Sequence, residues 1–130
     1  MTPLTHLNPD MVPAPLANYS HGVRVAADTE LLFLSGQVAL AERGEVPDGI
    51  DAQCEQVFRT IEALLESAGM AMADIVRLNA YLTERSHLPA YMAARARFVA
   101  SPPPASTLLL VQGFARPEFL VEVVVIAAKR

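Results

Sequence analysis

The last strand predicted in this chain is the feature that most constrains its fold. Residues 119–128 are apolar at nine of ten positions and interrupted only by Glu122, and four of them are β-branched in a row. Such a run predicts a strand that is covered on both faces. Residues 31–39 are almost as apolar and predict a second strand of the same kind. The architecture therefore depends on what covers the two faces of the sheet.

Two helices are available for that cover. Residues 51–68 place apolar side chains at three- and four-residue steps, which is the spacing of an amphipathic helix, and residues 87–99 return to similar spacing. Alternation or apolar runs predict three further strands. These further strands are expected over residues 19–26, 75–83 and 105–112. Residues 1–18 are expected to form an extended, proline-rich arm. The predicted order of elements after the arm is β-β-α-β-α-β-β.

Two helices cover only one face of a sheet, so the other face needs a different partner. A chain of 130 residues with 52% hydrophobic residues is expected to form one domain, with no second core to supply that cover. An apolar sheet face is much larger than the scattered patches of ordinary surfaces. The pattern therefore predicts association with copies of the same chain about a symmetry axis.

Charge and composition disfavour several classes of function. The formal net charge is −4, and the pair Arg95 and Arg97 resembles one edge of a helix, so no basic stripe for nucleic acid is evident. The single cysteine, Cys54, is typical of a cytoplasmic protein. The first fifteen residues carry four prolines and no signal-peptide pattern, and no stretch is long and apolar enough to span a membrane.

Metal binding is also disfavoured, because the three histidines and Cys54 show no ligand spacing. Glu122 is the unusual residue of the last strand, since a carboxylate there must be paired, hydrogen-bonded or at a wet cleft, unless the position faces solvent. Several polar residues beside apolar strands either form local hydrogen bonds or line a pocket, and the pattern leaves both readings open: Tyr19, Ser35, Gln37, Ser106 and Thr107.

Several stretches together resemble the Rid family, also called the YjgF/UK114 or L-PSP family. Residues 13–20 are similar to its Pro-x-Pro-x-Gly-x-Tyr-Ser opening, with Ala17 at the glycine position. Ser35-Gly36-Gln37 is similar to its Ser-Gly-Gln strand, and Pro104-Ala105 and residues 121–127 are similar to its last two strands. The resemblance covers essentially the whole chain.

The resemblance implies a chorismate-mutase-like α/β (α+β) fold and a homotrimer, in which three sheets form an inner barrel and small-molecule ligands bind in clefts between subunits. It also implies hydrolysis of imines or enamines to a keto acid and ammonia without a metal or organic cofactor. In the archetypal branch an arginine after the Pro-Ala pair holds the substrate carboxylate, and a glutamate on the last strand helps to position water.

This chain has Ser106 and Val124 at those two positions. We therefore expect a hydrolase or deaminase for an imine, enamine or related amino compound, with little activity toward 2-iminopropanoate or 2-iminobutanoate. The alternative is a non-catalytic trimer that binds a metabolite; a ribonuclease fits the acidic charge balance poorly. Arg24 and Arg116 are candidates to replace the missing arginine. No catalytic residue is assigned, and the expected cleft residues are Tyr19, Ser35, Gly36, Gln37, Ser106, Thr107 and Glu122.

Overall fold

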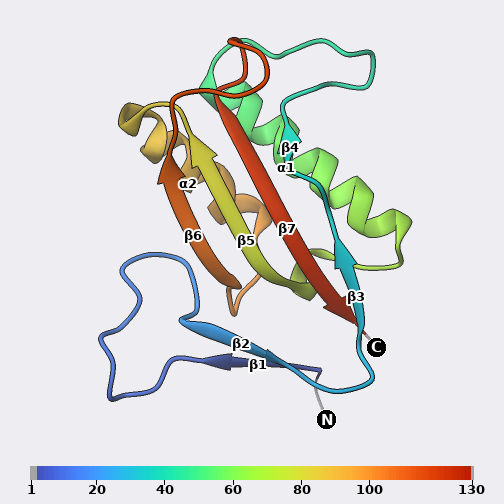
Figure 1. Cartoon of the computed structure of the whole chain (residues 1–130), viewed down its shortest axis with the longest axis vertical. Helices are drawn as coiled ribbons and strands as arrows, with labels where there is room; N and C mark the ends of the chain where they lie inside the picture. The colour runs from blue at the N-terminus through green and yellow to red at the C-terminus, as the bar shows by residue number, and fades with distance from the viewer. Residues whose placement is uncertain (1–2, 130) are drawn as a thin grey trace.

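The structure is a computed structural model that describes residues 3–129, and its centre is a mixed five-stranded sheet backed by two helices (Figure 1). The main path of the sheet runs β3-β7-β5-β6, and β4 also pairs with β7. Only β5 and β6 run parallel. The strands of this sheet are β3 (Glu30–Phe33), β4 (Gln37–Val38), β5 (Ile75–Leu82), β6 (Ala105–Leu110) and β7 (Val121–Lys129).

Helices α1 (Ile50–Ser67) and α2 (Leu88–Phe98) lie on the same face of the sheet, behind it in Figure 1. The short 3₁₀ turns η1 (Met72–Asp74) and η2 (Arg85–His87) precede β5 and α2. The prediction of two helices on one face of a mixed sheet is confirmed. Neither helix within residues 3–129 is long and apolar enough to cross a membrane.

The predicted order needs two corrections. The arm contains a strand of its own, β1 (Leu4–Leu7), which pairs with β2 (Gly22–Val25) as a separate two-stranded ribbon near one end of the main sheet (Figure 1). The expected strand over residues 31–39 is divided into β3 and β4. The interruption falls at Gly36, where an added Cβ would collide with the carboxylate of Glu122 on β7.

The core lies between the helices and the sheet. Alternate residues of β7 are fully buried against the helices, and α1 contributes the residues that its periodicity predicted. Large apolar side chains also remain on the face without helices. Phe33 is 67% exposed and Leu109 is 51% exposed, and their strand partners Ile126 and Tyr81 lie on that same open face. A single chain therefore leaves this face uncovered.

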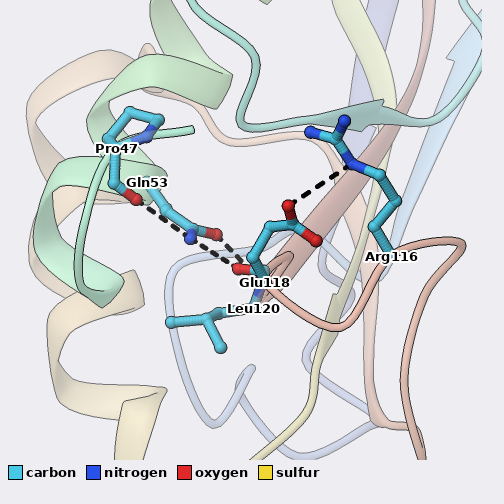
Figure 2. A network of polar contacts seen from close by, with 5 residues as sticks. All are labelled: Pro47, Gln53, Arg116, Glu118 and Leu120. Atoms are coloured by element: carbon cyan, nitrogen blue, oxygen red, sulfur yellow. Dashed lines mark hydrogen bonds and ion pairs between the residues drawn. The ribbon is translucent and has the colours of Figure 1, made fainter. Parts of the chain in front are cut away.

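A buried amide ties α1 to two loops, as Figure 2 shows. Gln53 is 2% exposed, and its Nε2 donates to the carbonyls of Pro47 at 3.1 Å and Glu118 at 2.8 Å. Its Oε1 accepts from the N–H of Leu120 at 2.9 Å. Every hydrogen-bonding atom of this side chain therefore has a protein partner, as a buried amide requires.

Candidate functional site

A cavity of about 270 Å³ lies where the arm, α2 and β6 meet. Its walls are mostly apolar, and its polar atoms come from a few side chains, which is the usual make-up of a small-molecule site. The lining residues are Ala17, Asn18 and Tyr19 of the arm, Leu88, Tyr91, Met92 and Arg95 of α2, and Ser106 and Leu108 of β6.

The side chain that stands out in this pocket is Arg95, which is only 3% exposed. Its Nη2 and Nε donate to the carbonyl of Asn18 at 2.6 and 3.1 Å. Its Nη1 donates to Ser106 Oγ at 3.1 Å and to Tyr91 Oη at 3.3 Å. One guanidinium therefore connects all three elements of the pocket.

Tyr91 lines the same pocket, one helical turn before Arg95, and is only 1% exposed. Burial raises the pKa of Tyr91 above its usual 10.0, although the neighbouring Arg95 charge and hydrogen bond act in the opposite direction. The phenol therefore stays protonated at neutral pH. Because its oxygen accepts the hydrogen bond from Arg95, its own O–H remains available as a donor to a ligand.

Two of the predicted site residues meet here, namely Tyr19 and Ser106. The hydroxyl of Tyr19 accepts from the backbone N–H of Leu16 at 3.2 Å, and its ring packs edge-on against His21 with centroids 5.9 Å apart. These contacts hold the Tyr19 ring in place beside the pocket. Thr107 lies on the opposite face of β6, where its hydroxyl accepts from Arg77 at 3.0 Å, so it is not part of this pocket.

The other predicted residues form a second group at β4 and β7. Gln37 Nε2 donates to the carbonyl of Ser35 at 3.0 Å, and Gly36 lies directly against Glu122. In the sheet, β4 pairs with β7, whereas β6 forms the edge on the far side of β5. A single subunit therefore does not bring this group to the pocket that contains Tyr19 and Ser106.

The two arginines considered as replacements lie elsewhere. Arg24 is on β2 opposite Thr5, and Arg116 contacts Glu118 at 3.7 Å and the ring of Phe119. Neither lines the pocket.

The interpretation of Arg95 and Arg97 as one edge of a helix was wrong, because Arg95 is buried whereas Arg97 is exposed. Its position four residues after Tyr91 and three before Phe98 places it on the apolar stripe of α2. The presence of a charged residue within an apolar stripe was the signal in the sequence that could have predicted the burial of Arg95.

The sequence model of the family Endoribonuclease L-PSP matches residues 10–129. The chain belongs to this family. The Rid family, as it is also called, thus accounts for nearly the whole chain, and the predicted family and fold are confirmed.

Individual relatives agree with this assignment. YyfB of Yersinia pestis, a Rid-family protein of unknown function, superposes with a TM-score of 0.86 at 30% identity over 96% of this chain and 98% of its own. A 2-iminobutanoate/2-iminopropanoate deaminase of Dermatophagoides farinae is 30% identical over 107 residues, which is 81% of each chain. The yeast protein HMF1 is 29% identical over 112 residues, or 85% of this chain and 84% of its own.

Proposed function

We propose that this Rid-family protein is a hydrolase that converts a small imine or enamine to a carbonyl compound and ammonia in the pocket between the arm, α2 and β6. The observation that carries the proposal is that Tyr91 and Arg95, which are hydrogen-bonded to each other, line one apolar pocket. A relative that is named as an imine deaminase supports the class of reaction.

The reaction needs a proton donor more than it needs a strong nucleophile. Water adds to the carbon of the C=N bond while the nitrogen gains a proton, and the resulting carbinolamine expels ammonia to leave C=O. Tyr91 fits the role of donor to the nitrogen, because burial keeps it protonated and Arg95 occupies its acceptor side. The added water supplies the replacement proton, so the phenol is regenerated.

The short imino acids 2-iminopropanoate and 2-iminobutanoate are poor substrates in this proposal. Ser106 offers a single hydroxyl where the archetypal branch has an arginine. The side chains of Leu88, Met92 and Leu108 also line a cavity that a one- or two-carbon substituent leaves largely unfilled. Each methylene buried there contributes about 0.8 kcal/mol, so a larger apolar substituent is favoured.

A cyclic homotrimer completes the proposed site. It supplies cover for Phe33 and Leu109 on the open face of the sheet. A head-to-tail arrangement also lets the edge at β6 of one subunit approach the β4–β7 edge of the next, where Ser35, Gln37 and Glu122 lie. Light scattering at micromolar concentration tests this assembly, and a stable monomer would contradict it. Phe33→Asp is expected to dissociate the trimer.

A non-catalytic, metabolite-binding trimer is the second candidate. It is favoured by one observation: none of the residues that line the pocket carries a carboxylate that could activate water. Ligand stabilisation without turnover would support this alternative.

A coupled assay separates the two functions. An amino-acid oxidase generates the imine from leucine or alanine, semicarbazide traps what survives, and a hydrolase lowers the rate of semicarbazone formation. We expect faster loss of the leucine-derived imine than of the alanine-derived one. Unchanged trapping with both, and with the imines of methionine and phenylalanine, would reject the hydrolase.

A further inference from the structure

The loop that joins β1 to β2, residues 8–21, supplies one wall of the pocket, yet most of it is exposed. None of its residues before Asn18 is buried, and Leu16 is 95% exposed. Its attachment to the body of the protein lies near its end, where Arg95 donates to the carbonyl of Asn18 and the buried Ser20 donates to the segment before β6. Hydrophobic burial therefore does not set the shape of the exposed part of the loop.

His21 is the residue that holds this loop closed. Its backbone N–H donates to Asn8 Oδ1 at 2.8 Å, at the start of the loop. Its ring Nε2 lies 2.6 Å from the carbonyl oxygen of Pro13, in the middle of the loop. A carbonyl oxygen can only accept, so Nε2 carries the proton and donates this hydrogen bond. One residue at the end of the loop therefore connects to both its start and its middle.

The same side chain reaches the pocket through Tyr19. The rings of His21 and Tyr19 pack edge to face, with centroids 5.9 Å apart and an interplanar angle of 82°. The Tyr19 hydroxyl accepts from the N–H of Leu16 at 3.2 Å, and Leu16 follows Pro13 along the loop with Pro15 between them. Because proline fixes its own φ, this short stretch is stiff, and a shift of the Pro13 carbonyl would also move the N–H that holds Tyr19.

We propose that His21 is a positioning residue for the pocket: it closes the loop over residues 8–21, and the closed loop holds the Tyr19 ring against the ligand. His21 is not among the residues that line the pocket, so it acts on a ligand through Tyr19 and the loop. The kinetic part of this inference rests on the proposed function. A ligand that needs the closed loop binds more weakly in proportion to the fraction of molecules in which the loop is open.

Loss of the imidazole should therefore raise KM and leave kcat almost unchanged, because the polar groups on α2 keep their places. His21→Ala removes the hydrogen bond to Pro13 and the ring contact with Tyr19. If the loop is then closed in about a tenth of the molecules, KM for the leucine-derived imine rises about tenfold. His21→Gln should bring KM back to within about twofold of the wild-type value, because its amide Nε2 is also a donor at a comparable distance from the backbone.

His6→Ala is the matched control. His6 lies on β1 of the same ribbon, opposite Val23, and its side chain makes no hydrogen bond within residues 3–129. We expect this variant to have the kinetics of the wild type. A wild-type KM in His21→Ala, a fall in kcat at constant KM, or a His21→Gln variant as impaired as His21→Ala would overturn the proposal.

A double-mutant cycle separates positioning of Tyr19 from a general loosening of the loop. Tyr19→Phe removes the hydroxyl to which Leu16 donates. If His21 acts through Tyr19, adding His21→Ala to Tyr19→Phe should raise KM by a smaller factor than His21→Ala does alone, whereas independent effects multiply. Factors that multiply would contradict the proposed path.

The tautomer of His21 tests the hydrogen bond in the wild-type protein, which covers the case in which His21→Ala does not fold. In a ¹⁵N-labelled sample at about pH 8.5, where free imidazole is neutral, long-range ¹H–¹⁵N correlations should place the ring proton on Nε2. A ring proton on Nδ1 alone would mean that Pro13 has no donor in His21 and would overturn the assignment.

The outcome for His21 is separable from the outcome for the reaction. Calorimetric titration with 4-methyl-2-oxopentanoate, the keto acid that hydrolysis of the leucine-derived imine yields, measures ligand affinity without turnover. Weaker binding by His21→Ala that His21→Gln restores, without any imine hydrolysis, would remove the hydrolase and keep the positioning role. Hydrolysis with a KM that neither substitution changes would do the reverse.

Discussion

Gln53 and Arg95 are both buried polar side chains that hold a helix to a distant loop, yet their surroundings differ. Gln53 on α1 has a protein partner for each hydrogen-bonding atom, in the loops that contain Pro47 and Leu120 (Figure 2). Arg95 on α2 keeps one charge that no described side chain neutralises, and it lines a pocket. Complete satisfaction is typical of a structural role, and an incomplete set beside a cavity is typical of a ligand site.

The largest expected effect follows from removing Gln53. Gln53→Leu loses three hydrogen bonds, and at about 1 kcal/mol each the free energy of unfolding should fall by about 3 kcal/mol. Urea denaturation at fixed protein concentration measures this loss. Ligand affinity of the folded variant should be unchanged.

Gln56→Leu is the matched control, because Gln56 lies on the same helix and its side chain donates a hydrogen bond to Thr60 Oγ1 at 3.1 Å, within the helix itself. We expect less than about 1 kcal/mol from this change. Equal losses for the two variants would show that the three hydrogen bonds of the buried Gln53 amide add no more stability than the one made by the half-buried Gln56.

The second effect concerns the pocket. Tyr91→Phe removes the proposed proton donor and should lower kcat for the leucine-derived imine by about a hundredfold, with little change in KM. Its stability cost should be small, because only the bond from Arg95 at 3.3 Å is lost. A variant with full activity would exclude Tyr91 as the donor.

The sequence predicted the framework better than the site. Helix 51–68 and strand 119–128 follow from periodicity and apolar runs, and they agree within two residues with α1 and within a few residues with β7. Local pattern could not predict the break before β4, because the contact between Gly36 and the carboxylate of Glu122 joins residues that are far apart in the sequence. It likewise could not show that Arg95 reaches Ser106 and the arm, since that contact depends on how α2 packs beside β6.

The separation of Tyr19 and Ser106 from Ser35 and Glu122 has the same origin. Sequence similarity groups these residues by family role, but strand order places them on different parts of the sheet in one subunit. Only an assembly of several copies of the chain could bring the two groups together. The sequence pattern carries no information about which sheet edges of two copies would be in contact.

The third expected effect is a pH dependence of the free energy of unfolding, and it arises on α1, the helix that contains Gln53. Burial, and next the charge of Asp51, raise the pKa of Cys54 on α1 from 9.0 to about 12. The unfolded chain therefore releases the thiol proton first, and the free energy of unfolding falls as pH rises above about 9, by up to about 1.4 kcal/mol per pH unit. Denaturation between pH 8 and 10.5 should show a shallower decline in Cys54→Ala. Parallel declines would show that other groups cause the loss.

The smallest expected effect on stability is that of Arg95→Met. The variant gives up hydrogen bonds to Asn18, Ser106 and Tyr91, but it also removes a buried charge that has no counter-ion, and the methionine fills part of the space with apolar atoms. Asn18 is exposed, so water can replace the donor to its carbonyl. These terms offset one another, and we expect a change of less than about 1 kcal/mol in the free energy of unfolding, measured beside Gln53→Leu under the same conditions. A loss as large as that of Gln53→Leu would mean that the guanidinium stabilises the fold as much as the amide does.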